Sequence, residues 1–121
     1  MPEFSARSKK NLGECDKRLQ DIFNEVIQRY DCTIVCGYRG QEAQDEAFHN
    51  GYSLLKFPMS KHNTYPSLAV DVVPYPSMWD NEKEFYYLAG YVQAVADKLN
   101  VRIKWGGSFE KFSDFAHWQL I

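Results

Sequence analysis

Short apolar runs rich in β-branched residues alternate along this chain with longer segments of helical periodicity, and this alternation limits the possible folds. Apolar residues recur at spacings of three and four residues over 11–30, the segment over 41–50 is made of good helix formers, and the segment over 82–100 carries apolar residues for one buried face. The expected strands span residues 32–36, 68–73, 101–105 and 117–121, and the expected helices span residues 11–30, 41–50 and 82–100. Their order predicts an α+β fold in which helices pack on a small, mostly antiparallel sheet.

The ends of the expected helices carry residues with known capping preferences. Asp80 or Asn81 can cap the start of the third helix, and Gly51 suits the position that follows the second. From Gly51 to Pro66 the sequence is rich in Gly, Pro, Ser, Asn and Tyr and has no periodicity. We expect a long loop there, of the kind that often carries function in a compact protein.

Composition limits the size of the core and the kinds of partner. With 121 residues and 45% hydrophobic side chains, the chain is expected to form a single domain over residues 1–121 with a proper core. A net charge of -2 gives no electrostatic reason to expect nucleic acid or an anionic membrane as a partner. Nothing in the composition demands more than a monomer.

The first ten residues contain no apolar run behind their basic side chains. We therefore expect neither a secretory signal nor a membrane span, and we expect synthesis in the cytoplasm. The chain also contains no internal repeat and no tract of low complexity.

The three cysteines, Cys15, Cys32 and Cys36, lie in apolar stretches and are odd in number. Buried free thiols are therefore expected, with Cys32 and Cys36 pointing to the same side of one strand. A zinc site built from cysteines would need closely spaced pairs, and the sequence has none.

Asp71 lies in the middle of the otherwise apolar strand over 68–73. An ionised carboxylate in such a place costs several kcal/mol unless a positive charge meets it. A metal ion is one such partner, and Arg39 or Lys61 is the alternative.

Two histidines are candidate metal ligands beside Asp71. His62 lies in the loop that leads into its strand, where a plain surface histidine is the alternative, and His117 begins the last strand, where a core histidine is the alternative. Two histidines and one aspartate can hold a catalytic zinc ion and leave one position open. His49 lies at a helix end, and we interpret it as a solvated or capping residue.

Asp114 precedes His117 by three residues and lies in an expected turn. A carboxylate that curls back over a metal site can accept a proton from the attacking water and deliver it to the leaving amine. The alternative is a turn or capping aspartate that follows Ser113.

Several motifs, taken in order, resemble the zinc D-Ala-D-Ala carboxypeptidase and L-alanyl-D-glutamate endopeptidase family, which includes VanX and VanY resistance peptidases and short phage endolysins. The similarity extends from Gly37 to Gln119, and the joint order of the motifs is more specific than any one of them. The motifs are Gly37-Tyr38-Arg39, Ser60-x-His62, Ala69-x-Asp71, Trp105-Gly106-Gly107 and Asp114-x-x-His117-Trp118.

The resemblance implies the small α+β fold that these peptidases share with the hedgehog signalling domain. It implies one Zn²⁺ ion held by His62, Asp71 and His117. It also implies that Asp114 acts as the catalytic base and then as the acid.

The resemblance assigns roles to other residues as well. Arg39 would steady the scissile carbonyl or a substrate carboxylate, with a structural pair to Asp71 or Asp45 as the alternative. Ser60 would help to position the substrate, with a plain loop hydroxyl as the alternative. The motif at 105–107 would shape the cleft wall and turn the backbone, with a core aromatic residue and an ordinary turn as the alternative.

Two features depart from the family pattern. The eight residues between His62 and Asp71 make a longer connection than is usual in the family, and we expect the extra residues to fall in the loop before the strand. The base is Asp rather than the Glu of the dipeptidases, which favours the endopeptidase and phage branch.

The implied substrate is the stem peptide of bacterial peptidoglycan, and the implied activity is that of a phage or prophage L-alanyl-D-glutamate endopeptidase. Without an export signal, such a protein would act on the wall after holin-type release or as a virion component. The alternatives are a D,D-carboxypeptidase or D,D-dipeptidase acting on D-Ala-D-Ala, and a non-catalytic interaction domain that holds zinc.

Overall fold

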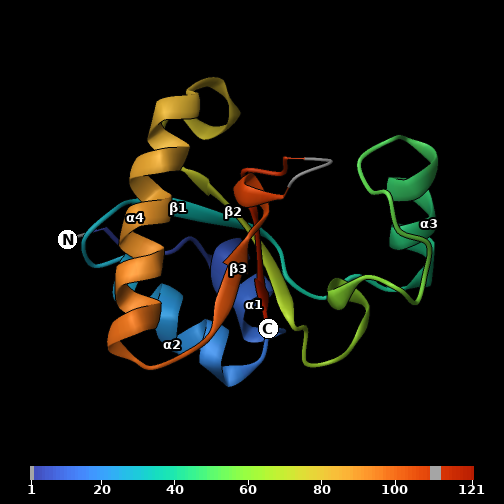
Figure 1. Cartoon of the computed structure of the whole chain (residues 1–121), viewed down its shortest axis with the longest axis horizontal. Coiled ribbons are helices and arrows are strands. Elements are labelled where there is room, and N and C mark those ends of the chain that lie inside the picture. Colours follow the sequence, from blue (N-terminus) through green and yellow to red (C-terminus); the bar gives the residue numbers. More distant parts are fainter. Residues whose placement is uncertain (1, 110–112) are drawn as a thin grey trace.

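The computed structural model describes residues 2–109 and 113–121, and within them four α-helices accompany one four-stranded sheet (Figure 1). The helices are α1 (Ala6–Gly13), α2 (Lys17–Val26), α3 (Gln41–His49) and α4 (Glu82–Lys98). The strands are β1 (Cys32–Cys36), β2 (Ala69–Pro74), β3 (Ile103–Trp105) and β4 (His117–Leu120), and short 3-10 helices are η1 (Lys61–Asn63), η2 (Met78–Asp80) and η3 (Gly106–Ser108). The sheet order is β1-β2-β4-β3 and each neighbouring pair is antiparallel, which confirms the predicted α+β fold.

The single helix predicted over 11–30 is wrong, because the chain breaks there into α1 and α2. At the break the Asp16 N–H donates to the Ser67 carbonyl at 2.8 Å, and the Ser67 N–H donates to the Glu14 carbonyl at 2.9 Å. The Asp16 side chain also accepts from the Arg18 N–H at 2.9 Å and so caps α2. Apolar spacing runs through the break without interruption, which is why periodicity alone predicted one helix.

The other elements lie close to their predicted ranges. Of the two capping candidates for α4, Asn81 is the N-cap, and its side chain accepts from the Lys83 N–H at 3.1 Å. Gly51 follows α3 with a φ of +79°, a left-handed conformation that glycine adopts without strain. The loop predicted from Gly51 to Pro66 contains η1.

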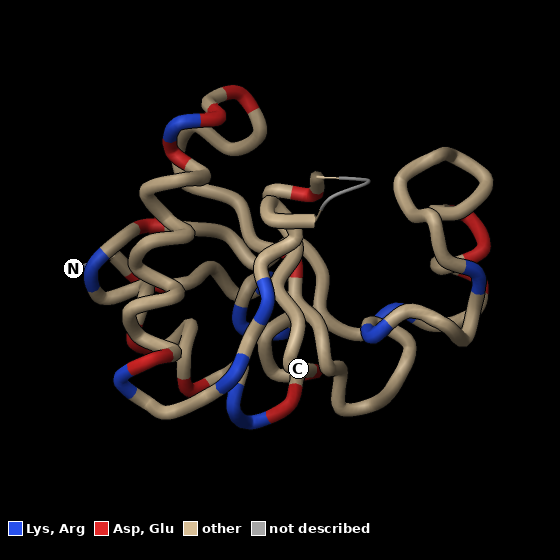
Figure 2. Tube along the Cα trace, viewed as in Figure 1, with Lys and Arg blue, Asp and Glu red and all other residues tan. Residues whose placement is uncertain are grey.

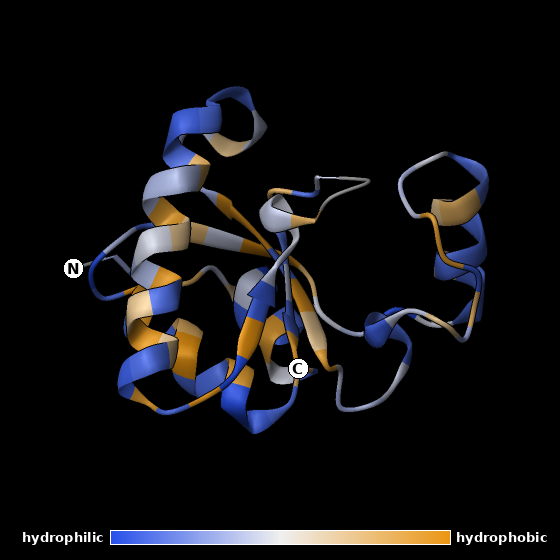
Figure 3. Ribbon diagram, in the orientation of Figure 1, coloured by the Kyte–Doolittle hydropathy of each residue, from blue (hydrophilic) through white to orange (hydrophobic). Residues whose placement is uncertain are grey.

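The two faces of the sheet differ in chemistry. On β2 and β4, alternate residues point to opposite sides, so Val70 and Trp118 face the helices while Asp71 and His117 face away. The helix-facing side chains form the main core with α1, α2 and α4, and hydrophobic residues lie where these helices meet the sheet (Figure 3). The polar functional side chains therefore share the face that the main core leaves free.

A β-bulge in β1 changes the face on which Cys36 lies. Ile34 pairs with Val72, but the register then shifts and Cys36 pairs with Asp71. Residues directly opposite one another in an antiparallel pair share a face, so the bulge turns Cys36 toward the polar side. The prediction that Cys32 and Cys36 share a side is thus wrong: Cys32 is buried in the core, whereas Cys36 is only partly buried.

The segment from α3 to Ser60, which we call the arm (residues 41–60), stands apart from the rest of the chain at the right of Figure 1. In α3 one side chain is buried, that of Gln44.

Lys and Arg residues are spread over several elements rather than gathered on one of them (Figure 2). Across residues 2–109 and 113–121, no helix has the length and apolar character needed to cross a membrane.

Candidate active site

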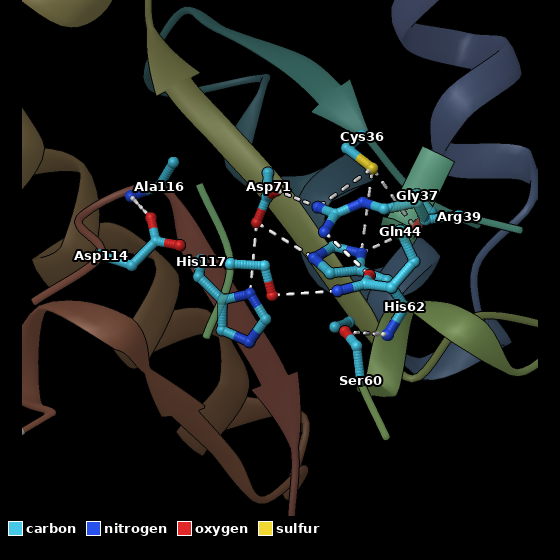
Figure 4. A network of polar contacts seen from close by, with 12 residues as sticks. Cys36, Gly37, Arg39, Gln44, Ser60, His62, Asp71, Asp114, Ala116 and His117 are labelled. Carbon is cyan, nitrogen blue, oxygen red and sulfur yellow. Dashed lines mark hydrogen bonds and ion pairs between the residues drawn. The ribbon is translucent and has the colours of Figure 1, made fainter. Parts of the chain in front are cut away.

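Asp71 lies between two histidines on the polar side of the sheet. Its Oδ1 atom is 3.2 Å from His62 Nε2 and 3.2 Å from His117 Nδ1, and the two imidazole centroids are 5.1 Å apart (Figure 4). β2 and β4 supply Asp71 and His117 as directly paired residues, and η1 supplies His62. The structure thus brings together the three side chains that the sequence suggested as ligands.

The outer nitrogen of each imidazole contacts an oxygen that only accepts hydrogen bonds. His62 Nδ1 is 2.7 Å from the Gly37 carbonyl oxygen, and His117 Nε2 is 2.8 Å from Gln119 Oε1. These contacts assign the protons to the outer nitrogens, which leaves the lone pairs of the inner nitrogens directed at Asp71.

Three electron-pair donors that converge in this way need a cation between them. Protons can fill that role: burial opposes charge on His62, but Asp71 outweighs it and raises the pKa of His62 to about 10. Burial likewise opposes charge on Asp71, but the two imidazoles hold the pKa of this carboxyl well below its usual range. A divalent metal is the other candidate cation, and two imidazoles with one carboxylate are ligands that suit zinc. The groups whose ligand atoms all lie within 4.8 Å of one another are Cys36, His62 and Asp71, and Asp71, Asp114 and His117, so Asp71 is common to both.

Arg39 is the cationic side chain that pairs with Asp71. Its Nη2 atom is 3.3 Å from Asp71 Oδ2, and its backbone N–H donates to the His62 carbonyl at 2.8 Å. Lys61, the other predicted partner, donates instead to the Leu120 carbonyl. Arg39 is therefore tied both to the carboxylate and to the segment that carries His62.

Asp114 lies beside the same cluster. Ligand atoms of Asp71, Asp114 and His117 fall within 4.8 Å of one another, and Asp114 Oδ1 accepts from the Ala116 N–H at 3.3 Å. Burial first, and the charge of Asp71 second, raise the pKa of Asp114 above its ordinary value. Asp114 is thus a turn aspartate, as the alternative supposed, and also a carboxylate held at the site.

Gly106 begins η3, and because it has no side chain the turn that carries Asp114 can pack closely against it. A Cβ atom at this position would lie 2.4 Å from the Asp114 carbonyl oxygen and 2.9 Å from His117 Cβ. Trp105 lies behind the turn, where its Nε1 donates to the Phe115 carbonyl at 2.8 Å and its ring stacks on Trp118. The expectation that Trp105 shapes the cleft wall is wrong, because its ring is used in this packing and other residues line the cleft.

Ser60 and the long connection to Asp71 fix the position of His62. The Ser60 side chain accepts from the His62 N–H at 3.2 Å and caps η1. After η1 the chain runs to Ser67, whose backbone hydrogen-bonds to Glu14 and Asp16 in the connection between α1 and α2. The extra residues between His62 and Asp71 therefore belong to a loop that leads away from the cluster of Asp71, His62 and His117. His49 is exposed at the end of α3, which fits a solvated residue.

Three residues near the site were not predicted. Cys36 Sγ lies 3.9 Å from His62 Nδ1, and Cys36, His62 and Asp71 form a second group of close ligand atoms. Gln119 contacts His117, and strand alternation could have revealed it because residues 117 and 119 share a face. Gln44 gave no signal, since residue type alone does not reveal which polar side of a helix is buried.

The site opens into a cleft of about 1160 Å³ between the arm and the turn before β4. Its floor is polar and its two walls are largely apolar. The floor includes Arg39, Ser60, His62, Asp71, Asp114 and His117, the arm wall includes Tyr52, Leu54, Leu55 and Met59, and the opposite wall includes Trp79, Phe85, Phe109 and Phe115. This volume is large enough for several residues of a peptide.

An α+β fold that places two imidazoles and two carboxylates on the floor of an open cleft has the layout of a hydrolase. The chain belongs to the phage L-alanyl-D-glutamate peptidase family, whose model matches residues 2–118. It is thus a peptidase of peptidoglycan, and the family predicted from the motifs is confirmed.

Among solved structures, the fold is similar to the crystal structure of the Serratia marcescens L-Ala D-Glu endopeptidase ChiX. The TM-score is 0.84 at 24% sequence identity, over 98% of this chain and 90% of that one. The comparison with curated proteins gives no match.

Proposed function

We propose that this chain is a zinc-dependent endopeptidase that cleaves the bond between L-alanine and D-glutamate in peptidoglycan stem peptides. His62, Asp71 and His117 hold the ion, and the observation that carries this assignment is that Asp71 Oδ1 lies 3.2 Å from one nitrogen of each imidazole. Zinc bound there supplies a Lewis acid and lowers the pKa of water toward ~7.

Asp114 serves as the general base and then the general acid. Its carboxylate lies within 4.8 Å of ligand atoms of Asp71 and His117, close enough to receive a proton from a water at the site. A carboxylate held beside the bound water can accept its proton and later return it to the leaving amine.

Arg39 steadies the oxygen of the scissile carbonyl, where negative charge develops as water attacks. Its side chain is only 16% exposed, and its guanidinium is held by Asp71 and by Gln44. A pre-positioned cation in a partly dry site stabilises such charge more than one in bulk water does. Ser60, which also lines the cleft, contacts the substrate beside His62.

The test of this function is digestion of purified peptidoglycan by the metal-depleted protein, with and without added zinc. New D-Glu amino termini found by mass spectrometry, formed only with zinc, support the endopeptidase. Release of D-Ala would instead identify a D,D-carboxypeptidase. Zinc bound without cleavage of any wall would identify a non-catalytic domain.

We further propose that the chain acts as a single-domain monomer that meets the wall after holin-type release or as part of a virion. Light scattering during size-exclusion chromatography measures the mass in solution. A stable dimer would contradict the proposed monomer.

A further inference from the structure

The side chain of Gln44 is fully buried, with an exposed fraction of 0%, and its amide contacts Arg39 at the candidate site. Burial of an amide without partners costs free energy, so a buried glutamine is expected to use its donors and acceptor. Gln44 uses them all on functional segments of the chain.

The oxygen of Gln44 faces the site. Gln44 Oε1 accepts from Arg39 Nη1 at 3.0 Å (Figure 4). It also accepts from Asn63 Nδ2 at 3.1 Å. The second guanidinium nitrogen of Arg39 contacts Asp71, so Gln44 and Asp71 hold the two ends of one planar group.

The nitrogen of Gln44 faces the arm. Gln44 Nε2 donates to Ser53 Oγ at 2.9 Å and to the Leu55 carbonyl at 2.7 Å. The Leu55 N–H in turn donates to Ser53 Oγ at 3.1 Å. This short turn carries apolar side chains of the arm wall, including Leu54 and Leu55.

Asn63 closes the network on the side of His62. Its Nδ2 also donates to the Arg39 carbonyl at 2.9 Å, and its Oδ1 accepts from the Ser60 N–H at 3.0 Å. One buried amide is therefore linked to the arm wall, the guanidinium and the segment that carries a candidate ligand.

We propose that Gln44 is a positioning residue that orients Arg39 toward the scissile carbonyl and anchors the arm wall of the substrate cleft. This inference rests on the proposed role of Arg39 in catalysis. Because Gln44 lies behind Arg39, it acts through that side chain and through the arm rather than on the substrate.

The decisive experiment is a double-mutant cycle of Gln44→Met and Arg39→Ala on a stem-peptide substrate. Methionine keeps the length of the side chain and removes both polar ends. We expect Gln44→Met to keep bound zinc and to lower kcat/KM by about 10–100-fold, as misplacement of a catalytic group does. In the Arg39→Ala background the same change should cost clearly less, because the part of the loss that acts through Arg39 is already absent there and only the part that acts through the arm remains.

A second readout follows the arm without use of activity. Trypsin cleaves after Lys56, and we expect faster cleavage there in Gln44→Met than in the wild type. Gln44→Glu keeps an acceptor for Arg39 but loses the donor to Leu55, so it should speed cleavage after Lys56 with a smaller loss of kcat/KM. Gln93→Met is the matched control, since the exposed Gln93 amide donates to Asp97 on its own helix.

Several outcomes would overturn the role of Gln44. One is wild-type kcat/KM and wild-type tryptic cleavage in Gln44→Met, and another is an equal loss of kcat/KM in both Arg39 backgrounds. If the wild type fails to cleave the L-Ala–D-Glu bond, the proposed function fails instead. The tryptic rate then decides by itself whether Gln44 anchors the arm.

Discussion

The two faces of the central sheet use the same strands for different purposes. On β4, Trp118 and Leu120 point into the main core, whereas His117 and Gln119 point toward the cleft. The core side is apolar and its contacts are non-directional, so similar side chains can replace one another there. The cleft side depends on individual atoms, because each nitrogen and oxygen has a specific partner.

The largest effect is expected from the candidate ligands. Replacement of His62, Asp71 or His117 by Ala should reduce bound zinc to well below one equivalent and abolish peptidase activity, because two donors do not hold the ion firmly. Plasma emission spectroscopy of each purified variant gives the zinc content. A full equivalent in all three variants would contradict the ligand assignment.

The next effect separates metal binding from catalysis. Asp114→Asn keeps the shape of the side chain and removes its basicity, so we expect unchanged zinc content and a kcat lower by about 10²–10⁴-fold. Steady-state kinetics on a stem peptide, with zinc measured on the same sample, checks this. Wild-type kcat in Asp114→Asn would remove Asp114 from the mechanism.

A smaller effect is expected from Gln119, which contacts the candidate ligand His117 but is not itself a candidate ligand. Gln119→Leu removes the oxygen that accepts a hydrogen bond from His117 Nε2, so the proton of His117 is no longer held on that nitrogen. We expect the zinc affinity to fall by about 10–100-fold. Competition with a fluorescent chelator measures that affinity. Unchanged affinity would show that Gln119 does not orient the imidazole.

Leu120→Ala is the matched change on the other face of the same strand. We expect it to lower the free energy of unfolding by about 2–5 kcal/mol, because it leaves a cavity in the core. The zinc affinity and the kcat of the folded protein should stay at the wild-type values. Urea unfolding and the same chelator assay distinguish the two faces directly.

The last prediction concerns the pH dependence of the metal-free fold. The raised folded pKa of His62, about 10, means that its pair with Asp71 stabilises the fold fully below the unfolded value of about 6.5 and is lost as pH rises through about 10. The lowered pKa of Asp71 means that its contribution is present above about 3.9 and is lost as pH falls below that value. Urea midpoints across pH should show both losses in the wild type and neither in Asp71→Asn.

Sequence reasoning succeeded where the signal was local. The strand over 32–36 is β-branched and ends at a glycine, and the motif order around Asp71 and His117 specified both the family and the residues that meet. It failed where partners distant in sequence decide the outcome. The break between α1 and α2 depends on Ser67, and the position of Cys36 depends on a register shift against Asp71.

The burial of polar residues was the least predictable feature. Gln44 and Gln119 are ordinary polar residues in the sequence, and their importance comes from where the arm and His117 lie in space. A pattern of residue types contains no information on which amide will find a buried partner. Such contacts become visible only when the fold is known.

The strand order has a consequence for how the protein is made. β4 is the last of the four strands to be synthesised, yet it lies between β2 and β3 and provides the sheet pairing of β3. A nascent chain that has not yet released residues 117–120 from the ribosome therefore has an incomplete sheet, and Asp71 lacks one of its two imidazoles. Completion of the fold and assembly of the candidate zinc site are the same late event, so a partly synthesised chain cannot become an active peptidase.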